Sequence, residues 1–133
     1  MTPENDIRKA LLTVCDAVGH WPYTQSAGVF IGFRPAGDQI EWARSMPIAA
    51  KVGYDIVIYH RLGSAEDAET MRFRVYEVLH AAGWILDGEP GPESYIENAE
   101  LFAWPLAARK RFYWRNGRLI TPDELREERI GSA

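Results

Sequence analysis

The three histidines and the single cysteine are the side chains of this sequence best suited to metal or nucleophilic chemistry. His20, His60 and His80 stand far apart, and no two have the three- or four-residue spacing that places metal ligands on one helix face. Cys15 falls on the apolar stripe of an expected helix, so its thiol should be buried and unreactive. One cysteine alone can form neither an intrachain disulfide nor a thiolate zinc site. The sequence therefore predicts no metal site and no cysteine-based catalysis.

The carboxylates, serines and glycines form no catalytic or nucleotide-binding pattern. The acidic residues at 66–69 cluster where the start of an expected helix favours negative charge. Those at 89–100 are spread through a loop and a strand, and no pair converges on one bond as glycoside hydrolysis requires. The sequence lacks a Gly-x-Ser-x-Gly elbow, a P-loop and a dinucleotide fingerprint. We therefore expect no catalytic residue, no cofactor and no metal, and a protein that is not an enzyme.

The strongest functional signal is residues 109–118, RKRFYWRNGR. Basic residues interleaved with aromatic ones can hold a single nucleic acid strand by phosphate contact and base stacking. A strand with alternate residues facing core and solvent, followed by a charged hairpin, has the same pattern. The net charge of −4 argues against a protein whose main role is to grip a phosphate backbone, so we favour the second explanation or a protein interface. The residues expected to form this interface are Arg109, Arg111, Trp114, Arg115, Arg118, Leu125 and Trp42.

Length and composition predict one folded, soluble domain. The 133 residues suffice for one continuous core but not for two. A chain with 12% aromatic residues is too apolar to be disordered. No apolar run approaches the length of about 18 residues that a membrane-spanning helix needs, and the first residues lack the basic and apolar regions of a signal peptide. We therefore expect a protein made in the cytosol, with no membrane partner.

Three segments carry helix signals, each with a hydroxyl side chain at the N-cap and acidic residues in the first turn. The apolar stripe of the first continues to Val18, and Gly19 is expected to end it. The third is highly charged, and a helix this short and polar is marginal without a neighbouring surface. The expected helices cover residues 3–18, 65–82 and 122–129, and the caps are Thr2, Ser64 and Thr121.

The strand signals are runs of β-branched and aromatic residues bounded by turns. Apolar residues on both faces of 51–60 predict a central strand, whereas 38–44, which carries Trp42, is expected to be an exposed excursion. Pro105 should interrupt the strand that begins near residue 95, and Asn116-Gly117 should form a hairpin turn. The expected strands cover residues 28–34, 51–60, 95–104, 107–114 and 118–120, and residues 20–23 open a connection.

This order of elements predicts an α+β fold. A helix-strand-strand-helix-strand-strand domain can place its helices on one face of a mostly antiparallel sheet, with the hairpin and the short helix appended at the C-terminus. We expect residues 1–108 to form the single core domain. Residues 109–133 are expected to form a C-terminal hairpin and helical arm that serves as an interaction extension.

Several sequence segments, taken together and in this order, form a recognisable pattern. The strand YDIVIY at 54–59 leads into a helix carrying Glu66, Ala68 and Glu69 and ending LHAAGW at 79–84, and YIENAELF follows at 95–102. Together with the length and the element order, this combination resembles the tail-terminator and tail-completion proteins of long-tailed bacteriophages. The likeness covers roughly residues 50–108, and its motifs are structural rather than chemical.

The resemblance implies a virion structural protein of the tail or neck, synthesised in the host cytoplasm. Such a protein forms a hexameric ring on the last ring of the tail tube, stops tube polymerisation and presents a surface to the head-completion proteins. The implied partners are other copies of the chain, the major tail tube protein, the head-completion or neck proteins, and DNA that passes through the lumen without specific binding. Two alternatives stay open: another neck or connector subunit, and a small binding module for single-stranded nucleic acid or a protein ligand.

Overall fold

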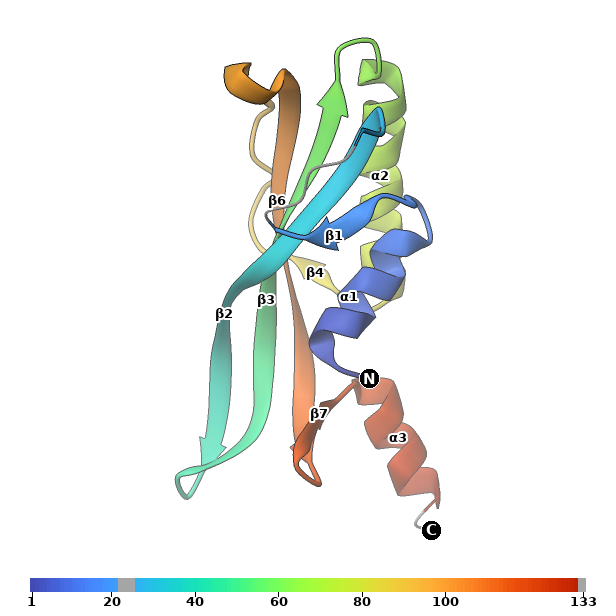
Figure 1. The fold of residues 1–133 in the computed structure, drawn as a ribbon. Helices are drawn as coiled ribbons and strands as arrows, with labels where there is room; N and C mark the ends of the chain where they lie inside the picture. Colours follow the sequence, from blue (N-terminus) through green and yellow to red (C-terminus); the bar gives the residue numbers. More distant parts are fainter. Residues whose placement is uncertain (22–25, 132–133) are drawn as a thin grey trace.

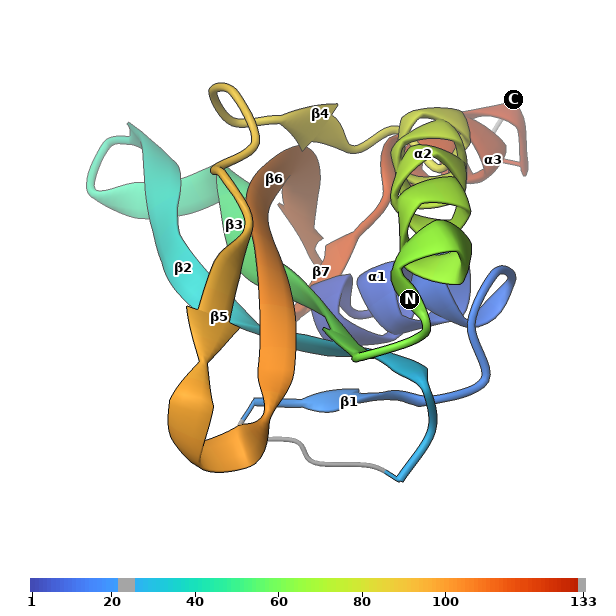
Figure 2. The ribbon, with the colours of Figure 1, turned by 90° about the horizontal axis from the view of Figure 1, so that it is seen from above.

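Three long antiparallel strands, β2, β3 and β6, form the centre of one curled sheet that carries its helices on one face (Figures 1 and 2). The computed structural model describes residues 1–21 and 26–131, so the connection expected at 20–23 lies partly outside the described residues. The strand order is β1-β2-β3-β6-β4, and β5 and β7 also pair with β6. Among the strands of the described residues only β1 pairs in parallel, so the α+β class and the mostly antiparallel sheet are confirmed. The elements are α1 (Pro3–Leu12), β1 (Val18–His20), β2 (Val29–Ala43), β3 (Met46–Arg61), α2 (Ala65–Ala81), β4 (Ile85–Leu86), β5 (Ser94–Ile96), the 3-10 helix η1 (Glu97–Ala99), β6 (Leu101–Arg115), β7 (Arg118–Ile120) and α3 (Pro122–Gly131).

The core lies between the sheet and the first two helices. Ile56 and Ile58 of β3 have no exposed surface and share the face toward the helices, because alternate side chains of a strand point to the same face. Trp84, directly after α2, packs edge-on against Tyr54 of β3. The helix residues that complete this core are Ile7, Ala10, Leu11, Val75 and Leu79. The opposite face of the sheet also carries apolar side chains at the end where β2 begins. Phe30 of β2 stacks on Tyr59 of β3 there.

The first helix is shorter than the sequence predicts. It ends at Leu12, and the Thr13 hydroxyl donates to the Ala10 carbonyl at 2.6 Å, where the helix was expected to continue to Val18. Val18 instead begins β1, which pairs with β2 at Ile31. The apolar stripe predicted too long a helix because the same apolar residues also suit a buried strand. The pairing that makes Val18 a strand residue is a long-range contact, which the local pattern does not show. Cys15 is buried as expected, and burial raises the pKa of its thiol.

The excursion expected at 38–44 is the second half of β2, paired with the first residues of β3. Arg44 and Ser45 form the turn of this hairpin, and both have positive φ, 50° and 64°, as in a type I′ turn. An Arg-Ser pair lacks the usual glycine or asparagine of such turns, so the sequence did not indicate a hairpin. The segment is nevertheless exposed, as expected for Trp42.

Pro105 does not interrupt a strand, because β6 runs unbroken from Leu101 to Arg115. The Pro105 carbonyl accepts a hydrogen bond from the Gly91 backbone N–H at 3.0 Å, on the edge away from β3. The nitrogen of a strand residue points to the same side as its carbonyl, so the donor that proline lacks would not have bonded β3. Residue 108 lies inside this strand, and Phe112 beyond it has no exposed surface.

The C-terminal hairpin and helix form as the sequence predicts. Asn116 and Gly117 have positive φ, 51° and 80°, and β7 returns along β6. The Thr121 hydroxyl accepts from the Glu124 backbone N–H at 3.1 Å, and the Glu124 carboxylate accepts from the Thr121 N–H at 3.1 Å. This reciprocal pair is a capping box at the start of α3.

Candidate interaction surface

Beyond the helices, the sheet continues as an arm made of two hairpins, one from β2 and β3 and one from β6 and β7 (Figure 1). We call residues 38–51 and 110–120 the distal arm. The first two helices cover only the other half of the sheet, and α3 packs beside β6. The face of the arm on the helix side therefore carries apolar residues as the core does, but the first two helices do not cover it.

Five large apolar side chains on the distal arm are exposed. Ile40 pairs with the core residue Ala50, and the neighbouring Glu41 points to the opposite face, so Ile40 and Trp42 share the helix-side face. Trp114 lies two residues after buried Phe112 on that same face. The exposed fractions are 46% for Ile40, 59% for Trp42, 62% for Met46, 46% for Ile48 and 40% for Trp114. Ile40, Trp42 and Trp114 thus expose large apolar side chains on one face of the arm, as interaction surfaces do.

Arg109 and Arg111, two of the expected interface residues, are engaged inside the chain. The Arg109 Nε lies 2.6 Å from the Asp87 carboxylate, and its Nη1 donates to the Gly37 carbonyl at 3.3 Å. Arg111 contacts both carboxylate oxygens of Glu41, at 2.9 and 3.0 Å. These arginines cross the strand β3 and link β6 to β2 on the face opposite the apolar one.

Gly53 of β3 permits the Arg109 contact. A Cβ atom there would lie 2.9 Å from the Gly37 carbonyl oxygen and 3.0 Å from the Arg109 Nη1. The distance to the Gly37 oxygen is too short for a carbon contact and the distance to the guanidinium is tight, so a side chain at position 53 would disturb the contact between Arg109 and Gly37.

The remaining expected residues divide into exposed and buried ones. Arg115 and Arg118 are exposed neighbours across the β6–β7 hairpin, and among the described residues neither forms an ion pair. Leu125 is only 7% exposed, so its side chain holds α3 against the domain rather than facing outward. The structure thus brings Trp42, Trp114, Arg115 and Arg118 together at one end of the molecule. Ile40, Met46 and Ile48 were missed, and the alternation Ile40-Glu41-Trp42 was the available signal.

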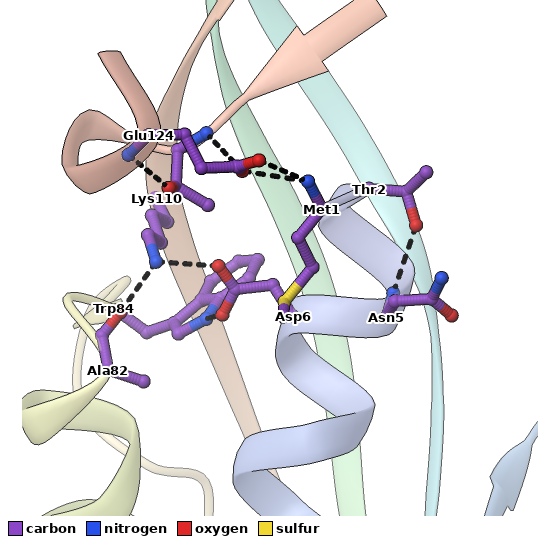
Figure 3. A network of polar contacts seen from close by, with 9 residues as sticks. Met1, Thr2, Asn5, Asp6, Ala82, Trp84, Lys110 and Glu124 are labelled. Carbon is purple, nitrogen blue, oxygen red and sulfur yellow. Dashed lines mark hydrogen bonds and ion pairs between the residues drawn. The ribbon is translucent and has the colours of Figure 1, made fainter. Parts of the chain in front are cut away.

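A buried polar network fixes the base of the arm to the helices (Figure 3). Lys110 of β6 donates from Nζ to the Asp6 carboxylate of α1 at 2.6 Å and to the Ala82 carbonyl after α2 at 2.6 Å. The Trp84 indole N–H donates to the other Asp6 oxygen at 3.0 Å. The Lys110 and Asp6 side chains are 9% and 7% exposed. Because the bonds reach three elements, they hold the arm in one orientation.

The N-terminus of α3 is tied to the same region. The Met1 amino group lies 2.7 Å from the Glu124 carboxylate, the group that also completes the capping box (Figure 3). The hydrogen bond from this ammonium is the main reason that the pKa of Glu124 is lowered. A groove of about 570 Å³ lies beside these groups, with Asp6 and Lys110 in its lining. The polar atoms of Asp6 and Lys110 are hydrogen-bonded to each other, which suits a structural role.

The described residues contain neither a cluster of metal ligands nor a membrane-spanning helix. Within residues 1–21 and 26–131, no three His, Cys, Asp or Glu side chains gather closely enough to hold a metal ion. None of the helices in that part of the chain is long and apolar enough to span a membrane.

No protein-family model matches the sequence, and no curated protein matches it significantly. The functional argument therefore depends on the surfaces that the chain itself presents.

Proposed function

We propose that this chain is a ring-forming tail terminator of a long-tailed phage, a structural subunit that caps the tail tube and joins it to the neck proteins. The observation that carries the proposal is the distal arm, a rigidly held projection with five exposed large apolar side chains. The α+β architecture is also the one that the resemblance implied.

The composition of the arm favours a protein partner. Aromatic residues, Met and Arg are enriched at protein interfaces, and the arm exposes Trp42, Met46, Trp114 and two arginines without ion pairs. A ring subunit must meet neighbouring copies, the tube and the neck, so it needs such surfaces outside its core. The same features suit another neck or connector subunit, which is the closest alternative.

The nucleic acid alternative has weaker support. Arg109 and Arg111 lie against the carboxylates of Asp87 and Glu41, and these carboxylates would repel the phosphates that the arginines were expected to bind. Of the four arginines in residues 109–118, this leaves Arg115 and Arg118 at the hairpin tip.

The proposal is tested by tube polymerisation. The purified chain is added to the major tail tube protein of the source phage while the tube assembles, and tube lengths and ends are imaged by electron microscopy. We expect shorter tubes with a six-fold ring at one end. Tubes of unchanged length and bare ends would contradict the proposal, and a monomer that binds oligonucleotides with a steep salt dependence would favour the nucleic acid module.

A further inference from the structure

The end of the molecule opposite the distal arm also exposes apolar side chains. The strand β3 connects the two ends, and its 16 residues at roughly 3.3 Å each separate them by roughly 50 Å (Figure 1). At this far end lie the turn after β3 and the segment from β5 through η1 to the start of β6. We call residues 61–63 and 95–102 the far end.

The far end has an apolar hollow. Leu62 is 87% exposed and Tyr95 is 52% exposed. The Tyr95 ring lies 4.9 Å from the ring of Phe102, and Phe102 stacks on buried His60 at 4.9 Å, so the aromatic floor is fixed. Leu62, Tyr95 and Phe102 line a hollow of about 560 Å³, together with Arg61 and Glu100. The hollow is large enough for an aromatic side chain from another molecule.

The two ends have opposite charges around their apolar centres. Exposed Glu100 lines the hollow, and exposed Glu97 lies in the adjoining 3-10 helix η1. The Arg61 guanidinium, also at this end, donates to the Ala27 carbonyl at 3.3 Å. The distal arm instead presents exposed Arg115 and Arg118, with exposed Arg44 at the other hairpin tip. An apolar surface bordered by arginines and an apolar hollow bordered by glutamates are complementary.

We propose that the distal arm of one copy docks on the far end of the next copy. The Trp42 side chain of the arm fills the hollow, and Arg115 and Arg118 lie against Glu97 and Glu100. The contact joins two different surfaces, so it is head-to-tail and propagates from copy to copy. Such a contact closes into a ring when the rotation between copies permits and otherwise forms a filament. Closure into a ring rests on the proposed function, whereas the pairing of the two surfaces does not.

Charge reversal at each end tests the contact. One variant carries Arg115→Glu with Arg118→Glu, and a second carries Glu97→Arg with Glu100→Arg. We expect wild-type association in sedimentation velocity over a concentration series, and association at least about tenfold weaker for each variant alone, because like charges then face each other. A control, Glu77→Arg with Glu127→Arg, makes the same charge change as the second variant at exposed positions outside both surfaces and should associate like wild type.

Mixing the two variants gives the decisive result. The glutamates of the first arm then face the arginines of the second far end, and the second arm meets an unaltered far end. An equimolar mixture should therefore recover association in an alternating order. A mixture that stays monomeric would overturn the proposal, as would a wild-type chain that stays monomeric throughout. Full association of the Glu97→Arg, Glu100→Arg variant alone would indicate a symmetric arm-to-arm dimer instead and would equally overturn it.

The tube assay separates this inference from the proposed function. If wild type caps tubes but the mixture does not recover association, the head-to-tail contact is wrong and the tail-terminator function stands. If the mixture recovers association but wild type leaves tube length unchanged, the contact stands and the function is wrong.

Discussion

At the scale of single residues, two buried polar features bear on the stability of the fold, the Asp6–Lys110 ion pair and the Tyr54 phenol. Lys110 and Asp6 form an ion pair that solvent barely reaches, and Tyr54 is only 5% exposed. Burial, together with the nearby carboxylates of Glu4 and Asp38, raises the pKa of the Tyr54 phenol to about 12. Each of these groups gives the stability of the fold a measurable dependence on charge.

Lys110→Met should lower the free energy of unfolding by about 3 to 5 kcal/mol, because it leaves the Asp6 carboxylate buried without its cation. Chemical denaturation measures this loss. The double variant Asp6→Asn, Lys110→Met should recover at least half of it, since the Asn oxygen still accepts from Trp84. Lys9→Met serves as the control, at an exposed position of α1, the helix that carries Asp6. It should change the free energy of unfolding by less than about 0.5 kcal/mol. Equal losses for Lys9→Met and Lys110→Met would contradict the assignment.

The raised pKa of Tyr54 predicts a loss of stability in alkali. Below pH 10 the phenol is protonated in both states and costs nothing. Between pH 10 and 12 the unfolded chain releases this proton and the folded chain keeps it, so the free energy of unfolding falls by about 3 kcal/mol as the pH rises. Denaturation at a series of pH values measures the fall.

Tyr54→Phe is the matched control for this pH dependence. The raised pKa values of Tyr59 and Tyr76 act in both proteins, so the difference between wild type and the variant isolates Tyr54. Parallel pH profiles for the two proteins would rule out the shift.

At the scale of elements, α3 depends on its cap and on a single buried side chain. Leu125 is buried, whereas Ile130 is 71% exposed, so α3 has little apolar surface to hold it. The capping box of Thr121 and Glu124 supplies hydrogen bonds for backbone groups that would otherwise lack them.

Thr121→Ala should therefore destabilise α3 by about 1 kcal/mol, the usual cost of losing a hydroxyl N-cap. Amide hydrogen exchange should show faster exchange in residues 122–131 and little change in the sheet. Thr70→Ala, at an exposed position inside α2, should leave exchange in α3 unchanged. Equal exchange in the two variants would show that the cap does not hold α3.

At the scale of the whole molecule, the folded protein is elongated. Its core lies in the helix-covered half, and apolar surfaces are exposed at both ends. Stability and the proposed association therefore depend on different residues. The Asp6–Lys110 network holds the arm in place, and the exposed side chains of the arm are left available to a partner.

Trp42→Ser is expected to separate these two properties. Trp42 is 59% exposed, so its loss should change the free energy of unfolding by less than about 0.5 kcal/mol. Association measured by sedimentation should weaken, because the side chain that we place in the hollow is gone. Trp84→Ser should do the reverse and destabilise the fold, since Trp84 is 2% exposed. A Trp42→Ser protein that associates like wild type would contradict the role given to the arm.

The sequence by itself determined the elements with local signals. The caps at Thr2 and Thr121, the Asn116-Gly117 turn and the alternation in residues 51–60 each follow from chemistry within a few residues. Cys15 is buried as predicted, although it lies after the end of α1 and not on a helix face. These predictions succeeded because caps, turns and alternation depend on neighbours along the chain.

Only the tertiary structure decided the features that depend on distant partners. Pairing with β2 made Val18 a strand residue, and Gly91 let Pro105 stay inside β6. The expected arginine patch was divided because Asp87 and Glu41, more than 20 residues away, bind two of its members. Strand pairing and ion pairs between distant segments leave no local pattern, so the arrangement of the candidate surface appears only in the folded chain.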